Sequence, residues 1–178
     1  MSTAASQLRS DIPRRMVLMG VAGCGKSSVG AALATRLGAV YCDGDDLHPA
    51  ENIAKMSKGI PLEDADRWPW LTRVGEALAA GTGPTIIGCS ALKRAYRQHI
   101  ERTAGAPVTF IHLAGTREVI EKRMKERQGH FMPPALLASQ FAALEPPGPD
   151  ENAISVDIDQ PLDAVVEAIA AQLGGLRK

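Results

Sequence analysis

Residues 20–27 read GVAGCGKS and match the phosphate-binding pattern G-x-x-x-x-G-K-[ST] at every position. Glycines let successive backbone N–H groups turn toward phosphate oxygens, in conformations that a Cβ would obstruct. Lys26 brings positive charge to the β- and γ-phosphates, and the Ser27 hydroxyl is the usual ligand of Mg²⁺. We therefore predict ATP and Mg²⁺ as cofactors. The predicted nucleotide contacts in this loop are Gly20, Val21, Ala22, Gly23, Cys24, Gly25, Lys26, Ser27 and Ser28.

A second group of chemically active residues is the acidic turn Asp43-Gly44-Asp45. It follows a short apolar run, so it would lie at the carboxyl end of a strand, where open α/β sheets place their ligands. A carboxylate there can hold Mg²⁺ through water or contact an attacking hydroxyl, because phosphoryl transfer needs an oriented nucleophile. We predict Asp45 at the acceptor hydroxyl and Asp43, with Ser27, nearer the metal. The two aspartates could exchange roles, and a turn that only caps the next helix is the alternative.

Basic residues at helical spacing form two further candidate groups. Arg123 and Arg127 are four residues apart and project from one helix face, where they could meet the adenine ring and the γ-phosphate. Lys93 and Arg97 would share one face of a helix that Ser90 caps, and they could hold an anionic substrate group. For both pairs, a solvated charged helix face remains the alternative.

The elements that must position these residues alternate between strands and helices. Apolar runs predict strands at residues 16–19, 39–42, 85–89, 108–113 and 154–157. Helical periodicity and punctuating Gly and Pro predict helices at about 26–37, 48–56, 63–80, 90–97, 117–127, 135–143 and 162–173. The face of the 63–80 helix would consist of Trp68, Leu71, Val74 and Leu78. Such alternation predicts a parallel sheet with right-handed crossovers in a three-layer α/β phosphate-loop fold.

Length and composition exclude several classes of protein. The chain has 178 residues, enough for one domain with a real core, and we expect residues 1–15 to be a flexible tail and residues 16–178 a single kinase domain. Basic and acidic residues balance at 20 each, so no global field recruits nucleic acid or an anionic membrane. Three cysteines without metal-ligand spacing, and no secretory leader, favour a cytoplasmic protein with reduced thiols.

Taken together and in this order, these motifs resemble those of the bacterial-type gluconokinases. The resemblance runs from Met16 to the last predicted helix. The phosphate loop alone names a very large superfamily, so the selective elements are the other motifs. These are DGDDLHP at 43–49 with Asn52 and Lys55, CSALK at 89–93 with Tyr96 and Arg97, GHFM at 129–132 after Arg123 and Arg127, and DIDQPL at 157–162.

The resemblance implies ATP-dependent phosphorylation of D-gluconate at its 6-hydroxyl, giving 6-phosphogluconate and ADP. It also implies a nucleoside-monophosphate-kinase-like fold with strand order 2-3-1-4-5, a mobile lid over about residues 123–140, and a homodimer. By resemblance, Arg123, Arg127, Gln160 and Pro161 would surround the nucleotide. The catalytic residues would be Lys26, Asp45 and Arg127, and the sugar-acid contacts would be Asp45, His48, Lys93, Arg97 and His130.

Other functions of the same loop remain open from the sequence. Another small-molecule kinase of this fold, such as a shikimate kinase, would also use an aspartate turn. The glycine-rich turn expected of such an enzyme at a strand end reads Gly88-Cys89-Ser90-Ala91 here. A nucleotide-dependent binding module without phosphoryl transfer is the alternative from a different class. A nucleoside-monophosphate kinase is disfavoured because no base-recognition segment is evident.

Overall fold

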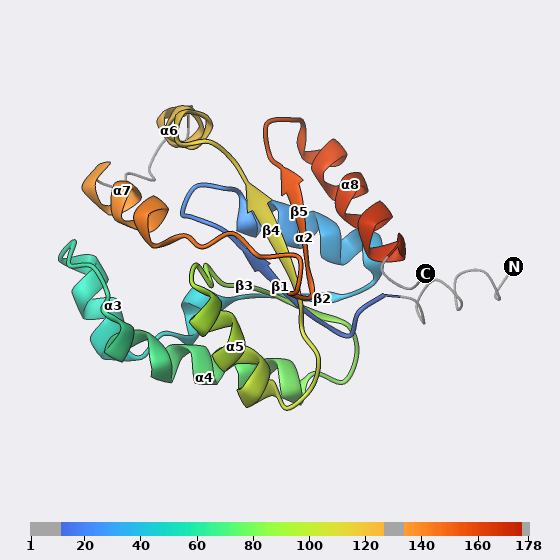
Figure 1. Cartoon of the computed structure of the whole chain (residues 1–178), viewed down its shortest axis with the longest axis horizontal. Helices are drawn as coiled ribbons and strands as arrows, with labels where there is room; N and C mark the ends of the chain where they lie inside the picture. Colours follow the sequence, from blue (N-terminus) through green and yellow to red (C-terminus); the bar gives the residue numbers. More distant parts are fainter. Residues whose placement is uncertain (1–11, 127–133, 176–178) are drawn as a thin grey trace, which may run out of the picture.

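The computed structural model describes residues 12–126 and 134–175, which form a twisted parallel sheet with helices on both faces (Figure 1). The strand order is β2-β3-β1-β4-β5, with every neighbouring pair parallel, which confirms the predicted 2-3-1-4-5 order. The strands are β1 (Arg15–Met19), β2 (Val40–Asp43), β3 (Thr85–Gly88), β4 (Thr109–Ala114) and β5 (Ala153–Asp157).

Helices α2 and α8 pack on one face of the sheet, and α4 and α5 pack on the other, so the predicted three-layer α/β fold is confirmed. None of the helices in the described part of the chain has the length and hydropathy that a bilayer crossing requires. The helices are α2 (Lys26–Leu37), the 3₁₀ turn η1 (Gly44–Leu47), α3 (Ala50–Ser57), α4 (Asp64–Ala80), α5 (Arg94–Ala104), α6 (Arg117–Glu126), α7 (Pro134–Ala143) and α8 (Leu162–Gly175).

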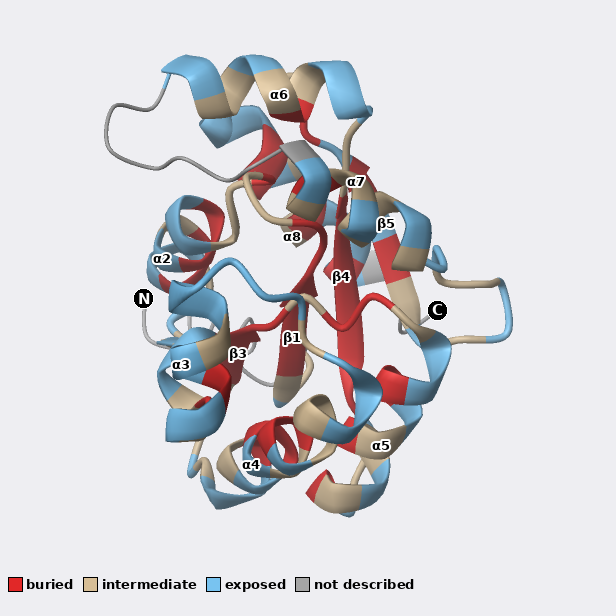
Figure 2. Cartoon of the chain, turned by 90° about the vertical axis from the view of Figure 1, so that its left-hand side faces the viewer, coloured by how far each residue is buried: buried red, intermediate tan, exposed pale blue. Residues whose placement is uncertain are grey.

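The central strand β1 shows why its sequence is an unbroken apolar run. Met16 and Leu18 belong to the core cluster beneath α2 and α8, whereas Val17 and Met19 belong to the cluster beneath α4 and α5. Successive side chains of a strand point to opposite faces. Since both faces are covered, every one of these four residues is fully buried (Figure 2). The carboxyl end of β1 is therefore fixed from both sides.

The carboxyl edge of the sheet gathers the chemically active segments. The phosphate loop leaves β1, the turn η1 leaves β2, and residues 89–93 leave β3. Register brings them together, because Gly88 at the end of β3 pairs with Asp43 on one side and with Leu18 on the other. The acidic turn and the phosphate loop thus lie across a single intervening strand.

The helix that Ser90 was predicted to cap begins at Arg94 with Lys93 as its N-cap, three residues later than predicted. The Ser90 carbonyl accepts the Gly20 N–H at 3.2 Å, and Ala91 is fully buried with a φ of 43°. The Ala91 and Leu92 carbonyls accept hydrogen bonds from the Arg97 guanidinium. These tertiary contacts hold residues 90–92 in an irregular turn, so the prediction that Ser90 caps the helix is wrong.

Helix α4 begins with a capping box, in which the Asp66 side chain accepts the Glu63 N–H and the Glu63 side chain pairs with the backbone N–H of Asp66. Leu71, Val74 and Leu78 are buried as predicted. Trp70, however, takes the fully covered position expected of Trp68, which is only half-buried. The difference matters because Trp70 reaches the acidic turn.

Candidate active site

The phosphate loop has the backbone conformation that its glycines suggest. Gly23 and Gly25 have φ angles of 81° and 96°, in the left-handed region that favours glycine. A Cβ on Gly23 would also lie 2.8 Å from Cγ of Met124, so α6 packs directly on the loop. The Lys26 ammonium donates to the carbonyls of Gly20 at 2.9 Å and Val21 at 3.2 Å. The loop is therefore a closed turn at the N-terminus of α2, the arrangement that binds anions.

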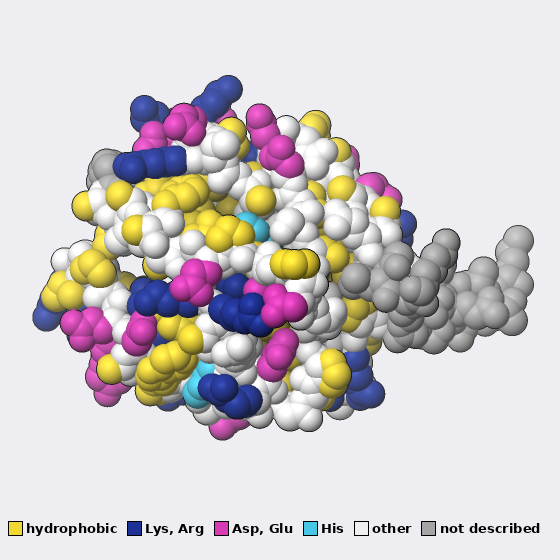
Figure 3. Space-filling model, in the orientation of Figure 1, with side chains coloured by type: hydrophobic (Ala, Val, Ile, Leu, Met, Phe, Trp, Pro, Cys, Tyr) yellow, Lys and Arg dark blue, Asp and Glu magenta, His cyan; other side chains and the backbone are white. Residues whose placement is uncertain are grey.

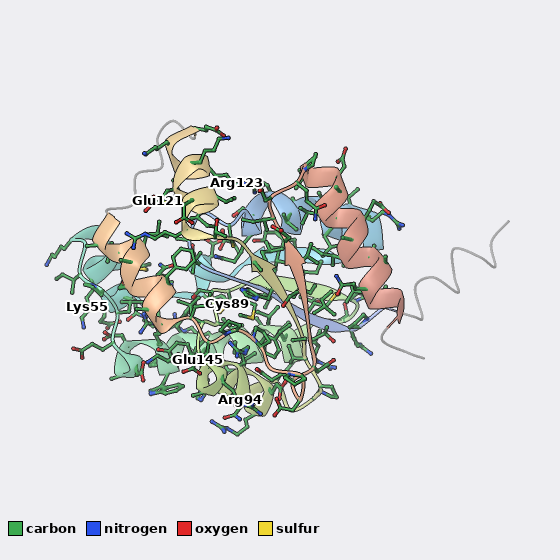
Figure 4. The ribbon with its side chains drawn as sticks, turned by 45° about the horizontal axis from the view of Figure 1, so that its top comes forward. Lys55, Cys89, Arg94, Glu121, Arg123 and Glu145 are labelled. Carbon is green, nitrogen blue, oxygen red and sulfur yellow. The ribbon has the colours of Figure 1, made fainter. Side chains whose placement is uncertain are left out.

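A cavity of about 410 Å³ opens beside the loop and is lined by part of the predicted nucleotide contacts. Arg123 enters it from α6 and donates hydrogen bonds to the carbonyls of Ile158 and Gln160 (Figure 4). The wall is part apolar and part polar, which suits a nucleoside. The predicted residues that line it are Gly23, Gly25, Ser28, Arg123, Gln160 and Pro161.

Two predicted site residues, Arg127 and His130, lie outside the described residues. Part of the predicted lid, residues 127–133, and most of the predicted N-terminal tail lie outside them as well.

The acidic turn is built by close packing at the end of β3. Asp43 caps η1, because its Oδ1 accepts the Asp45 N–H at 2.9 Å. Gly44 lies so close to the sheet that a Cβ would meet the Gly88 carbonyl oxygen at 2.3 Å. The Trp70 indole N–H donates to the Gly44 carbonyl at 2.8 Å. The backbone of the turn is therefore held at Gly44, between Asp43 and Asp45.

The Asp45 carboxylate is largely exposed, with 79% of its side chain accessible, yet its pKa lies above the ordinary value. The main cause is the surrounding protein, which displaces bulk water around the concave edge, and the second cause is the negative charge of Asp43. Lys26 opposes this shift, so its ammonium is close enough for its charge to act on Asp45. The predicted acceptor carboxylate and the phosphate-loop lysine thus share one electrostatic environment.

His48 is buried beside Asp45, with 3% of its side chain exposed. Its ring stacks on Trp70 at 4.0 Å between centroids, and its Nδ1 lies 3.2 Å from the Asn52 amide nitrogen. Because that amide can only donate, Nδ1 is the acceptor and the proton of the neutral ring is on Nε2, 3.9 Å from an Asp45 oxygen. Burial and then the Arg67 charge lower the His48 pKa to about 4. His48 is therefore a neutral donor at neutral pH.

A cationic cluster next to His48 contains Lys93 and a residue to which the sequence analysis gave no role, Arg67. Lys93 Nζ and Arg67 Nη1 lie 3.5 and 3.8 Å from one oxygen of Asp64. The Tyr96 hydroxyl donates to the same oxygen and accepts from Arg67 at 3.2 Å. One carboxylate against two cations leaves a net positive charge. In the sequence, Arg67 lies in the run Asp66-Arg67-Trp68-Pro69-Trp70, which also belongs to the resemblance to gluconokinases.

Arg97 does not join this cluster, and the prediction that it shares a helix face with Lys93 is wrong, because Lys93 is the N-cap of α5 and Arg97 is buried within the helix. Its guanidinium is buried and donates to the Glu151 carboxylate at 2.7 and 3.1 Å and to the carbonyls of Ala91, Leu92 and Glu145. Every N–H group is thus engaged within the protein. Figure 3 shows basic and acidic side chains side by side at the surface over α5, where Arg94 pairs with Asp150. Arg97 is therefore a structural residue and not a substrate contact.

Ser27 and Asp43 carry oxygen atoms of the kind that a hydrated divalent cation takes as ligands. The Tyr41 hydroxyl is a buried polar atom without a hydrogen-bond partner among the described residues. Burial, followed by the Asp43 charge, raises its pKa to about 12. Across the described ranges, no three His, Cys, Asp or Glu side chains gather as a metal centre. Magnesium in kinase sites needs only one or two protein ligands, since phosphates and water supply the rest.

Comparison with known proteins relates this chain to gluconokinases. The family model described as "AAA domain" matches residues 16–147. A gluconokinase of Gluconobacter oxydans (strain 621H) is 46% identical over 161 residues, covering 88% of this chain and 89% of that protein. The thermoresistant gluconokinase of Escherichia coli (strain K12) is 47% identical over 154 residues, covering 84% and 87%.

The three-dimensional comparison agrees with the sequence comparison. The crystal structure of a gluconokinase from Sinorhizobium meliloti 1021 superposes with a TM-score of 0.87 at 47% identity, covering 93% of this chain and 94% of that one. The shikimate kinase of Aquifex aeolicus has the same fold, with a TM-score of 0.57 at 18% identity.

Proposed function

The chain belongs to the gluconokinase family within the group of AAA-domain phosphate-loop proteins, and on that premise we propose that it transfers the γ-phosphoryl group of ATP to the 6-hydroxyl of D-gluconate. The observation that carries the proposal is the placement of the Lys26 loop and the Asp45 turn at one sheet edge, across the single strand β3, where the Lys26 charge acts on Asp45. An acceptor hydroxyl at Asp45 would therefore face phosphates bound by the loop. The products would be ADP and 6-phosphogluconate.

We assign recognition of the gluconate carboxylate to the cationic cluster of Lys93 and Arg67. Lys93 and Arg67 leave an excess positive charge beside Asp64, which suits the gluconate carboxylate. Arg67 also acts electrostatically on His48, and His48 lies next to Asp45, so the cluster and the acceptor carboxylate belong to one continuous site. Neutral His48 would donate its Nε2 proton to a substrate hydroxyl. A linear polyhydroxy acid would thus be held at its two ends.

We assign the nucleotide and metal contacts from how the phosphate loop suits phosphates and how the cavity suits a nucleoside. The loop amides and Lys26 would hold the phosphates, Arg123, Gln160 and Pro161 would border the adenine, and Ser27 and Asp43 would hold Mg²⁺. Bound Mg²⁺ neutralises phosphate charge and orients the terminal phosphates. Arg127 as a catalytic cation and His130 as a substrate contact stay predictions. So do the single domain at 16–178, the lid over about 123–140, the homodimer and the cytoplasmic location.

The decisive experiment measures ADP release with D-gluconate, shikimate or AMP as acceptor. We expect turnover with gluconate alone.

Asp45→Asn should lower kcat by about a hundredfold or more, the scale of a lost acid–base contact, while ATP binding is kept. Asp46→Asn is the matched control, because Asp46 is an exposed carboxylate of the same turn. Unchanged turnover in Asp45→Asn would assign the acceptor role elsewhere, and silence with every acceptor would contradict the proposed function.

A further inference from the structure

The feature that the proposed site leaves unexplained is a side chain of α7 that contacts the phosphate loop. The Gln140 Oε1 accepts the backbone N–H of Ala22 at 2.6 Å, across 118 residues of sequence. A backbone N–H can only donate, so the oxygen of the side-chain amide must face the loop. The amide NH₂ group of Gln140 consequently points away from Ala22 with a fixed orientation.

The position of Gln140 is set by packing on both sides of it. Leu137, one turn earlier, is buried with 2% exposure, and Phe141 and Leu144 pack against the same core. Beyond the helix, the Glu145 N–H donates to the Leu92 carbonyl at 2.8 Å. Gln140 therefore projects from an element that is anchored at its core face and at its C-terminal end.

Gln140 meets the loop next to the place where the lysine ammonium lies. Ala22 follows Val21, and the carbonyls of Val21 and Gly20 both accept from Lys26 Nζ. In this loop pattern the lysine reaches the β- and γ-phosphates, whereas backbone N–H groups of the loop cradle the inner phosphates and the Ser hydroxyl takes the metal. The contact is thus at the terminal-phosphate side. Within the described residues, the Gln140 NH₂ has no hydrogen-bond partner.

We propose that Gln140 donates its amide NH₂ to the γ-phosphoryl group of the bound nucleoside triphosphate while its oxygen holds the loop at Ala22. This inference rests on the proposed function, because the γ-phosphoryl group is the group that the proposed reaction transfers. A neutral donor complements Lys26, because charge in phosphoryl transfer is spread over several equatorial oxygens that one ammonium cannot serve alone. Gln140 would bind γ-phosphoryl and leave the inner phosphates to the loop.

Two substitutions separate the donor from the anchor. Gln140→Glu keeps an oxygen that accepts the Ala22 N–H but removes the NH₂ donor, whereas Gln140→Met removes both. The matched control is Gln98→Glu, the same chemical change at an exposed position of α5. For each protein, calorimetry with Mg²⁺ gives the affinities for ADP and for a non-hydrolysable ATP analogue with an imido bridge. Turnover with gluconate is measured separately.

We expect both Gln140 variants to lose about tenfold or more of the analogue affinity relative to ADP, the scale of a hydrogen bond to a charged group. The Gln98→Glu protein should keep the parent ratio. A parent-like ratio in Gln140→Glu would overturn the donor role and leave only the anchor. A loss in Gln140→Glu with a parent-like ratio in Gln140→Met would attribute the loss to added charge and would also overturn it. The affinity ratio needs no acceptor, so it is independent of the gluconate assignment.

Discussion

At the scale of single residues, the site depends on how the protein sets the charge of Asp45 and His48. Both groups are shifted toward their neutral forms, Asp45 because of the surrounding protein and Asp43, and His48 because of burial and Arg67. His48 is held neutral by its environment, so it can donate a proton in a hydrogen bond throughout the neutral range. Asp45, by contrast, must be ionised to accept the hydrogen of a substrate hydroxyl. The two shifts therefore have opposite consequences as the pH falls.

The raised pKa of Asp45 predicts the acid limb of the activity profile. As the pH falls, Asp45 takes up its proton at a higher pH than an ordinary aspartate, so turnover should fall above the range in which a free aspartate titrates. Asp43→Asn keeps the Oδ1 that accepts the Asp45 N–H but removes the charge. In that variant the limb should move to lower pH, as measured by kcat/KM for gluconate between pH 4 and pH 8, roughly. An unmoved limb would show that another group titrates there.

At the scale of elements, the buried ion pair of Arg97 and Glu151 joins three segments. Arg97 belongs to α5, its guanidinium holds the carbonyls of the 90–92 turn, and Glu151 belongs to the connection from α7 to β5. Glu145 adds a further link, since its side chain accepts the Arg94 N–H at the start of α5. The turn that leads to Lys93 and the segment that follows α7 are thus fixed to each other. Loss of Arg97 should therefore affect stability before it affects chemistry.

We expect Arg97→Met to lower the free energy of unfolding by about 3–5 kcal/mol, because Glu151 would remain buried without its partner. Arg94→Met is the matched control, since it removes the neighbouring but exposed ion pair with Asp150, and we expect little change. Urea unfolding of each variant and of the parent protein measures these free energies of unfolding. Equal effects in the two variants would contradict a special role for the buried pair. A selective rise in the KM for gluconate in Arg97→Met, with unchanged stability, would return Arg97 to the substrate site.

At the scale of the whole molecule, the parallel sheet concentrates one function at one edge. Three successive strand ends, of β2, β3 and β1, carry the acidic turn, the Lys93 segment and the phosphate loop. The cavity proposed for the nucleotide extends this edge toward α6 and the start of α8. Because the bound nucleotide would contact segments from both halves of the chain, its binding should stabilise the fold as a unit.

Nucleotide binding should therefore raise the melting temperature. With Mg²⁺ and ADP at a hundred times the dissociation constant, linkage predicts about 2.7 kcal/mol of stabilisation. For a chain of this length that corresponds to a rise of about 5–10 °C. Lys26→Met should abolish most of the rise, whereas Lys58→Met, at an exposed position after α3, should keep it. Calorimetric melting with and without ADP is the measurement, and an equal rise in Lys26→Met would argue against phosphate binding by the loop.

The sequence by itself determined the elements and the chemistry of the phosphate loop. Strands and most helix positions followed from local periodicity and punctuation, because these depend on neighbours in the chain, whereas the strand order was implied by the family resemblance. The tertiary structure alone decided which basic residues are neutralised by a buried partner and which remain available to bind a substrate. Arg97 is neutralised by a glutamate 54 residues away, Arg67 joins Lys93 across 26 positions, and Gln140 reaches a loop 118 residues earlier. Burial and charge pairing arise from contacts distant in sequence, so residue type and spacing could not distinguish an anchoring arginine from a binding one.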